Sequence, residues 1–276
     1  MKQYLEALKY CYKKGVDVDS RAGKVRKAFG YQMRFDLEDG FPAVTTKKLA
    51  WKAVVSELLW FLEGSNDERR LAEILYNDKK ENLTDKKTIW TQNAQADYWK
   101  PKAKFEGDVG KIYGVQWRNF NGVDQINTLF NGIKNNPNSR RHILSAWNPA
   151  ELDLMSLPAC HAFSQFFVAK QKLSCQLYQR SCDMFLGVPF NIASYSLLTH
   201  LIARECNLDV GEFVHTLGDY HIYHEHFNQV ETQLTRSTKK IPNLTFETKK
   251  IEEYTVNDFK LANYDPHPKI SAEMNV

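Results

Sequence analysis

The chain has 276 residues, of which 43% are hydrophobic and 25% are charged, a composition typical of a folded globular protein. Its 37 basic and 33 acidic residues leave a formal net charge of +4, which is too balanced for a nucleic-acid binder with one basic face. No apolar run approaches the roughly 18 residues of a membrane-spanning helix, and the first residues lack the apolar core of a signal peptide. We therefore expect a cytoplasmic protein of enzyme size, with neither a membrane nor a nucleic acid as partner.

The spacing of apolar residues predicts helices and strands in irregular alternation. In chain order they are a helix over residues 4–12, a strand over 29–37, helices over 51–62 and 123–133, a short strand over 142–147, a strand pair over 163–168 and 173–178, and a helix over 191–206. Gly15 and Gly64 end the first two helices, and the polar region 65–110 predicts short peripheral helices and loops. No repeat or linker divides the chain, so we expect one domain over residues 1–276 with an α+β fold, a mixed sheet packed by helices.

One of the five cysteines is a candidate nucleophile. The set shows neither the spacing of a disulfide scaffold nor that of a zinc knuckle. Cys160 begins one predicted strand, and Arg180 ends the strand that pairs with it, so the hairpin should return Arg180 towards Cys160. A nearby guanidinium stabilises a thiolate, which is the reactive form of cysteine.

Polar and reactive side chains gather among apolar neighbours in three segments, 157–161, 178–183 and 187–191, as expected for the lining of a pocket. Arginines are the second signal, because guanidinium groups bind phosphate in a bidentate way. Arg140 and Arg141 follow a turn and, as neighbours on a strand, should point to opposite faces. Both can reach one phosphate only if the chain bends there or if a second subunit supplies them.

Three histidines lie within the segment 221–226 and raise the question of a metal site. The helical i, i+4 spacing pairs His221 with Glu225, and no ligand motif follows downstream. We expect no metal here. His221 and Tyr223, two residues apart on one strand face, fit hydrogen bonding to a sugar hydroxyl better.

Motifs along the whole chain resemble those of the thymidylate synthase family. The matching segments are DGFPAVTTK (39–47), ELLWFL (57–62), IYGVQWR (112–118), SRR (139–141), PACH (158–161), YQRSCD (178–183), PFNIASY (189–195), GDYHIY (218–223) and YDPHP (264–268). The resemblance implies a homodimer whose sheets pack back to back. It also implies reductive methylation of dUMP to dTMP, with 5,10-methylenetetrahydrofolate as donor of the one-carbon unit and the hydride, and without a metal. Cys160 would add to C6 of uracil, which makes C5 nucleophilic and divides one difficult step into two easier ones.

The resemblance assigns roles to residues at matching positions. Those implied in catalysis are Cys160, Glu57, Tyr113, Arg180 and Asn191. Those implied in dUMP binding are Arg21, Arg140, Arg141, Arg180, Ser181, Asp183, Asn191, His221 and Tyr223, with Arg140 and Arg141 donated across the dimer interface. Those implied in folate binding are Lys47, Trp90, Asp183, Gly187, Phe190 and Val276. Glu57 and Tyr113 would organise proton transfer through water.

The resemblance also implies which base the site recognises, through the side-chain amide of Asn191. Asn191 would read the uracil edge, because an amide can both donate and accept as the N–H and C=O groups of uracil require. Related enzymes that act on deoxycytidylate carry Asp at this position, so Asn191 argues for uracil. Asp183 would bond the pterin ring, and Lys47 would meet the glutamate tail of the folate.

The chain also departs from the usual family pattern. The phosphate loop usually reads Arg-Thr-Gly-Thr, whereas Arg21 is followed here by Ala22-Gly23-Lys24 in a shorter loop without those hydroxyls. Trp90 is usually followed by Asp and here by Thr91. The other departures are Ala159 before Cys160, Tyr220 beside His221, and Glu273 and Asn275 in a polar C-terminal tail.

These departures bear on the outcome of the reaction. A synthase must keep water from the methylene intermediate until hydride is transferred. Where water enters, the product is hydroxymethyl-deoxyuridylate and tetrahydrofolate leaves unoxidised. We expect a thymidylate synthase, with two alternatives: a dUMP hydroxymethylase, favoured by the change after Trp90, or an inactive relative that binds nucleotide or folate. A decayed site would usually lose at least one of its key residues. The joint presence of Cys160, Arg180, Asn191 and Glu57 therefore argues against the inactive relative.

Overall fold

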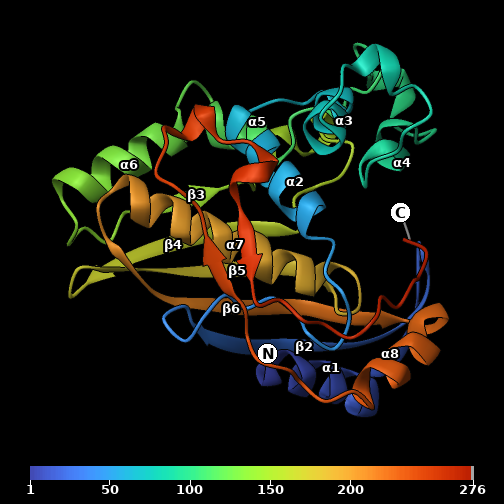
Figure 1. Cartoon of the computed structure of the whole chain (residues 1–276). Coiled ribbons are helices and arrows are strands. Elements are labelled where there is room, and N and C mark those ends of the chain that lie inside the picture. Colours follow the sequence, from blue (N-terminus) through green and yellow to red (C-terminus); the bar gives the residue numbers. More distant parts are fainter. Residues whose placement is uncertain (275–276) are drawn as a thin grey trace.

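The computed structural model describes residues 1–274 and contains a six-stranded sheet with helices packed against it (Figure 1). The helices are α1 (Lys2–Lys14), α2 (Trp51–Glu63), α3 (Glu68–Tyr76), α4 (Thr91–Ala94), α5 (Tyr113–Arg118), α6 (Gln125–Asn135), α7 (Gly187–Glu205) and α8 (Phe227–Leu234). The strands of the sheet are β1 (Val16–Ser20), β2 (Gly23–Asp36), β3 (Ile143–Ser145), β4 (His161–Ala169), β5 (Lys172–Asp183) and β6 (Asp209–Tyr223). A separate pair is formed by β7 (Asn243–Thr245) and β8 (Lys260–Ala262).

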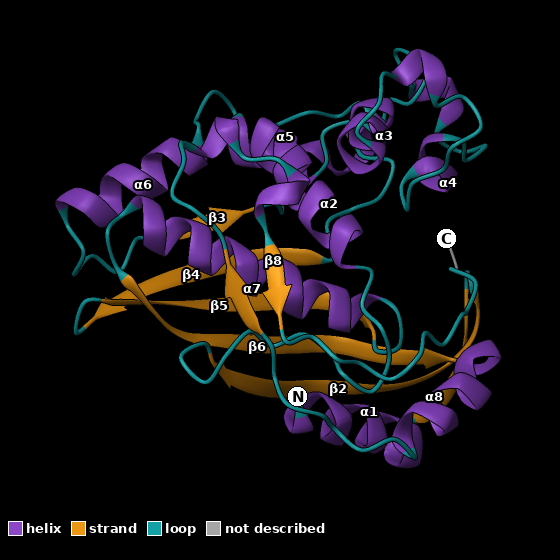
Figure 2. Ribbon diagram, in the orientation of Figure 1, coloured by secondary structure: helices purple, strands orange, loops and turns teal. Residues whose placement is uncertain are grey.

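The sheet is mixed, with the strand order β1-β2-β6-β5-β4-β3. β5 and β6 are parallel, and the other neighbours are antiparallel. Parallel neighbours need a long crossover, which α7 supplies by running back over the sheet (Figure 2). The expected α+β fold, a mixed sheet packed by helices, is therefore confirmed. The extent of a single domain over residues 1–276 stays a prediction.

One face of the sheet carries the core, and the other is open. Along β4, Phe166 and Val168 are buried, whereas Phe163 and Phe167 are 39% and 63% exposed. Tyr178 of β5 is exposed on the same open face. Alternation of this kind is typical of a sheet covered by helices on one side only. The aromatic side chains of Phe163, Phe167 and Tyr178 on this open face are thus not covered by other parts of the described chain.

The predicted ends of the first two helices are confirmed. The backbone N–H of Gly15 caps α1, and Gly64 follows α2 in the left-handed conformation at φ 75°. A Cβ on Gly64 would lie 2.7 Å from Cγ of Arg118, so both the backbone and the neighbouring side chain require glycine here.

Several boundaries differ from the sequence prediction. β2 begins at Gly23 rather than at residue 29, because it pairs with β1 in a hairpin that has no continuous apolar signal. Arg140 and Arg141 lie in the turn before β3, so the prediction that they sit on a strand is wrong. Val123 lies outside α6, because Asp124 caps that helix with its side chain.

The region 65–110 forms short helices and loops at the periphery, as predicted. Within residues 1–274, no helix combines the length and the apolar character needed to cross a membrane.

Candidate active site

The candidate nucleophile lies where a loop enters the sheet. Cys160 immediately precedes β4 and is half-buried, and its carbonyl accepts the backbone N–H of Arg180 at 2.8 Å. Burial raises the pKa of the Cys160 thiol. The guanidinium of Arg180 and the hydroxyls of Tyr113 and Ser181 act in the opposite direction. These groups partly offset the effect of burial, which remains the larger one and leaves the pKa of the thiol above its ordinary value.

Arg180 holds the segment that carries the thiol. Its Nε donates to the Ala159 carbonyl at 2.8 Å, and its Nη2 donates to the Pro158 carbonyl at 2.7 Å and lies 3.9 Å from Sγ of Cys160. The predicted approach of Arg180 to Cys160 is therefore confirmed. Among residues 1–274, no hydrogen bond engages Nη1. Since a guanidinium carries five N–H donors, two of them are available for an anion.

Tyr113 supports the other side of the thiol. Its hydroxyl accepts the backbone N–H of Cys160 at 2.7 Å, and its ring stacks on His161 at 3.8 Å between centroids. Nδ1 of His161 lies 2.8 Å from the hydroxyl of Tyr195. Burial lowers the pKa of His161 to about 3, so this imidazole is neutral near pH 7.

Glu57 is a buried carboxyl beside this group. It lies in α2 with 5% of its surface exposed, and Nε1 of Trp90 donates to its Oε1 at 2.7 Å. Burial raises the pKa of Glu57 to about 7, although the Trp90 hydrogen bond acts against this shift. A carboxyl with such a pKa can give or take a proton at neutral pH.

Thr91, the residue after Trp90, links this segment to α3 by a hydrogen bond. Thr91 is buried, and its hydroxyl donates to Oε1 of Glu68 at 2.6 Å. Thr88 donates to the same oxygen at 2.6 Å, and Nε of Arg69 lies 2.6 Å from Oε2. The carboxylate that the family usually places after Trp90 is thus replaced by a threonine that binds a carboxylate from α3.

The amide of Asn191 is held in one orientation. Nε2 of Gln179 donates to Oδ1 of Asn191 at 3.1 Å and to the Ser181 carbonyl at 3.0 Å. Oε1 of Gln179 lies 2.8 Å from Nε2 of His215, whose pKa burial lowers to about 3. Because Oδ1 already faces a donor, Nδ2 of Asn191 is directed to the other side as a hydrogen-bond donor.

The beginning of α7 brings further candidates together. Oδ1 of Asp183 accepts the backbone N–H of Phe185 at 2.9 Å, which fixes the carboxylate ahead of the helix. Gly187 opens α7, and a Cβ there would lie 3.5 Å from Cβ of Asp183 and 3.7 Å from Oδ1 of Asn191. Phe190 follows on the same helix and is half-buried.

His221 and Tyr223 end β6 beside this group. Asp183 of β5 pairs with His221 in the sheet, and the rings of His221 and Tyr223 meet edge to face at 5.3 Å. Burial raises the pKa of Tyr223 to about 12, and the charges of Asp183 and Cys160 add to that effect.

Arg21 and Lys47 occupy different environments. Arg21 is exposed in the turn between β1 and β2, and its charge lowers the pKa of Tyr223, so it lies within electrostatic reach of the site. Lys47 is 6% exposed and donates to the Phe185 carbonyl. Burial lowers the pKa of Lys47 to about 8. Binding a glutamate tail would require its ammonium to exchange that carbonyl for a carboxylate.

Two predicted arginines lie apart from the other residues. Arg140 and Arg141 are exposed, and Nε2 of Gln165 donates to the Arg140 carbonyl at 3.1 Å. Gln165 projects from the open face of the sheet, so this pair lies at the rim of that face. Among residues 1–274, no hydrogen bond or ion pair joins either arginine to Cys160. Val276, implied in folate binding, lies outside the described residues.

The three histidines of the segment 221–226 have separate partners. Nδ1 of His221 lies 3.4 Å from Asp219, and Nε2 of His224 lies 3.1 Å from Asp17. Nε2 of His226 donates to the Glu273 carbonyl at 2.8 Å. In the part of the chain that the structure describes, no three His, Cys, Asp or Glu side chains converge as metal ligands do.

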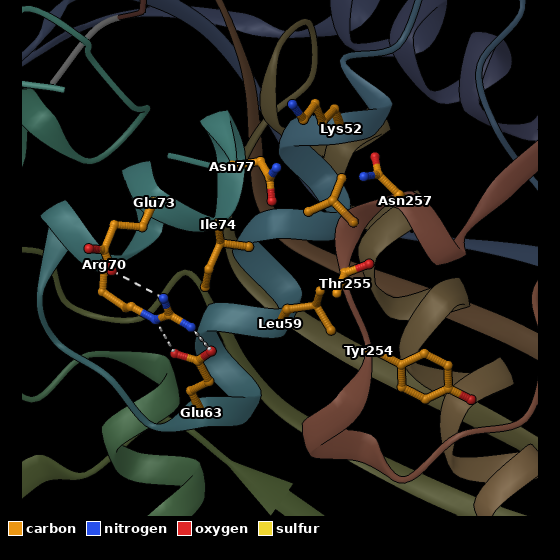
Figure 3. A pocket seen from close by; sticks show the side chains of 11 residues that line it. Lys52, Leu59, Glu63, Arg70, Glu73, Ile74, Asn77, Tyr254, Thr255 and Asn257 are labelled. Carbon is orange, nitrogen blue, oxygen red and sulfur yellow. Dashed lines mark hydrogen bonds and ion pairs between the residues drawn. The ribbon is translucent and has the colours of Figure 1, made fainter. Parts of the chain in front are cut away.

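A pocket between α2, α3 and residues 254–257 is a separate feature (Figure 3). Its arginine, Arg70, is paired with Glu63 at 2.8 Å and Glu73 at 3.1 Å, so its charge is neutralised within the chain. None of the predicted site residues lines it.

Four contributors to the candidate site were missed at the level of sequence: His161, Gln179, His215 and Glu68. His161 and Gln179 lie within the polar segments 157–161 and 178–183, and this location is the sequence feature that could have indicated their role. Glu68 and His215 act through partners far away in the chain, and no local pattern indicates such contacts.

The profile of the family described as thymidylate synthase matches residues 2–276. Because the match covers essentially the whole chain, the protein belongs to the thymidylate synthase family. This is a family of methyltransferase-type enzymes that bind dUMP and folate and use methylenetetrahydrofolate as co-substrate.

Proposed function

We propose that the protein is a thymidylate synthase that converts dUMP to dTMP with 5,10-methylenetetrahydrofolate. The observation that carries the proposal is the position of Cys160, whose thiol lies 3.9 Å from the Arg180 guanidinium and whose backbone N–H donates to the Tyr113 hydroxyl. A thiolate adds readily to an electron-poor ring carbon, and both neighbours favour that charge state.

The nucleophilic step uses groups that are already in place. Sγ of Cys160 bonds to C6 of uracil, and the electron pair displaced from the C5–C6 double bond is delocalised onto the C4 carbonyl oxygen. Glu57, with a pKa of about 7, is suited to exchange a proton with water near that oxygen. Tyr113 keeps the thiol segment aligned through the Cys160 backbone.

Base selection follows from the held amide of Asn191. Uracil offers an N3–H donor next to the O4 acceptor, whereas cytosine offers an N3 acceptor next to an N4 donor. A freely rotating amide could serve either base by exchanging its two ends. Gln179 holds Oδ1 on one side, which leaves Nδ2 to donate to O4 and Oδ1 to accept N3–H.

The phosphate would be bound by arginines from two subunits. Nη1 of Arg180 and the exposed Arg21 come from one chain, together with the Ser181 hydroxyl. Arg140 and Arg141 would come from a second copy, since both lie at the rim of the open sheet face. Exposed aromatic residues on that face support its burial in a homodimer with sheets back to back.

The side chains around Trp90 fit a folate. When bound, the folate supplies the one-carbon unit and the hydride. Asp183 offers a carboxylate for the pterin ring, with Gly187 and Phe190 beside it. Nδ2 of Asn93 in α4 is buried without a partner among residues 1–274, and so offers a donor beside Trp90.

The synthase is favoured over the hydroxymethylase by the fastening of the Trp90 segment. Trp90 is 5% exposed and bonded to Glu57, and Thr91 is bonded to Glu68. The change after Trp90 therefore ties the segment to α3, which supports the exclusion of water at this side of the site. The tail is also held, since His226 binds the Glu273 carbonyl. A cytoplasmic location stays a prediction of the sequence.

The deciding experiment mixes the purified protein with dUMP and methylenetetrahydrofolate, and follows both near-ultraviolet absorbance and the mass of the nucleotide. A synthase gives rising absorbance from dihydrofolate and a product heavier by one CH2, because a methyl group replaces the hydrogen on C5. The control is Cys160→Ser, which should lose turnover but bind dUMP within about tenfold of the parent, because only the covalent step is removed.

Each other result identifies an alternative. A flat absorbance trace with a hydroxymethylated product identifies the hydroxymethylase. Binding of dUMP without any product identifies an inactive relative. Turnover by Cys160→Ser would remove Cys160 from the role of nucleophile.

A further inference from the structure

Arg21 lies in the turn of the β1–β2 hairpin. Ser20 and Gly23 pair at its end, and the Ser20 hydroxyl donates to the Gly23 carbonyl. Gly23 has φ 107°, a conformation that glycine adopts readily. Ala22 and Lys24 stand where the family usually has threonines, so those two hydroxyls do not contribute to holding Arg21.

A tyrosine from the peripheral region meets Arg21 instead. The guanidinium carbon of Arg21 lies 5.7 Å from the ring centroid of Tyr98, within cation–π distance. Tyr98 lies between α4 and the turn that begins at Lys100, far from the hairpin in sequence. It therefore supplies a contact from outside the hairpin.

Tyr98 is itself anchored at both ends. Its hydroxyl donates to the Ser156 carbonyl at 2.7 Å, only a few residues before Cys160. Next to it, Trp99 is 3% exposed, and its Nε1 donates to the Asp108 carbonyl at 2.7 Å. The ring under Arg21 is thus fixed between a buried tryptophan and the segment that leads to the nucleophile.

Arg21 lies close to the site, because it is at the end of the hairpin in which Val25 of β2 pairs with Tyr223 of β6. Its charge accordingly lowers the pKa of Tyr223, which the charges of Asp183 and Cys160 raise. We propose that Tyr98 is a positioning residue that holds the Arg21 guanidinium at the phosphate end of the nucleotide pocket, in place of hydroxyls within the loop. This inference rests on the proposed function, because it takes the nucleotide phosphate as the group that Arg21 binds.

The test compares ligands with and without phosphate. Dissociation constants for dUMP are measured by calorimetry, and inhibition constants for deoxyuridine by competition, for the parent, Tyr98→Leu, Arg21→Ala and the double variant. Tyr98→Leu should weaken dUMP binding about two- to fivefold, the range expected of one exposed cation–π contact. Deoxyuridine inhibition, kcat and the KM for the folate should stay unchanged.

The double variant separates positioning from general damage. If Tyr98 acts through Arg21, the Tyr98→Leu change adds no further loss of dUMP affinity once Arg21 is alanine. Tyr98→Phe keeps the ring and loses the Ser156 anchor, so its dUMP affinity should fall between those of the parent and Tyr98→Leu.

Tyr76→Leu is the matched control. Tyr76 is also an exposed tyrosine of the peripheral region, and its hydroxyl donates to the Lys87 carbonyl at 2.8 Å. Its replacement should leave dUMP binding unchanged. An equal loss for dUMP and deoxyuridine, additive losses in the double variant, or no loss in Tyr98→Leu would each overturn the inference while dUMP binding by the parent sustains the proposed function. Failure of the parent to bind dUMP would overturn both.

Discussion

The carboxyl of Glu57 shows how one neighbour adjusts the pKa of a group in this site. Its carboxyl is buried in α2, and its hydrogen bond from Trp90 favours the ionised form. The pKa of about 7 is the balance of a large effect of burial and a smaller opposing effect of the indole. Removal of the indole N–H therefore has a predictable sign.

In Trp90→Phe the pKa of Glu57 should rise by about one to two units, since a hydrogen bond to a charged group contributes about 1.5–3 kcal/mol in favour of that charge. The limb of the kcat/KM profile that reports Glu57 in the free enzyme moves to higher pH. Trp99→Phe is the control, because its Nε1 donates to the neutral Asp108 carbonyl. An unmoved limb in Trp90→Phe would mean that Glu57 does not set it.

Asn191 is tuned by Gln179, which decides the end of the amide that meets the base. Asn191→Asp keeps the acceptor for Gln179 but replaces the Nδ2 donor by a second oxygen, which repels the uracil O4. Preference should shift towards deoxycytidylate by about 1–3 kcal/mol for each altered hydrogen bond, or about five- to 150-fold. The ratio of kcat/KM for the two nucleotides measures it, and an unchanged ratio would show that Asn191 does not read the base.

At the scale of elements, α4 depends on α3 for its position. α4 has four residues, Thr91–Ala94, and is too short to be stable alone. Glu68 holds it through the Thr91 hydroxyl, while Arg69 and Thr88 bind the same carboxylate. This clamp fixes Trp90 at the wall of the site.

Thr91→Val should lower the free energy of unfolding by about 1–3 kcal/mol, because the buried Glu68 carboxylate loses a donor without gaining water. Urea unfolding measures the change. Thr232→Val is the control, since that hydroxyl is exposed and donates to the Asn228 carbonyl within α8. Equal stability of Thr91→Val and the parent would show that the clamp does not hold the segment.

The sequence predicts the elements whose signal is local. The β4–β5 hairpin follows from two apolar runs around a short loop, and it places Arg180 beside Cys160 by register alone. β1 escaped prediction because all five of its residues are exposed. The contacts of Glu57 with Trp90 and of Arg21 with Tyr98 join distant segments, and neither apolar spacing nor turn chemistry encodes such pairs.

At the scale of the whole molecule, the open sheet face and the outlying arginines point to the same arrangement. A two-fold dimer buries the same face of both copies. It would cover Phe163 and Phe167 and carry Arg140 and Arg141 of each copy towards the site of the other.

Two inactive variants should therefore complement each other. Cys160→Ser and the double variant Arg140→Ala, Arg141→Ala each lack one part of every site, but a mixed dimer has one site with both parts. Equal mixing with subunit exchange should restore about a quarter of the parent activity, as half of the dimers are mixed and one of their two sites is complete. Cys160→Ser alone is the control, and no recovery in the mixture would place all phosphate ligands in one chain.

The pairing of β2 with β6 also has a consequence for biosynthesis. β2 ends at Asp36, and its partner begins only at Asp209. The ribosome must therefore synthesise most of the polypeptide before β2 can pair with β6 in the middle of the sheet. Until then, one edge of the β1–β2 hairpin remains unpaired. Non-local pairing of this kind slows folding and exposes strand edges to aggregation. We expect the nascent chain to be a substrate of cellular chaperones, and we expect the β2–β6 pairing to form only after the chain leaves the ribosome.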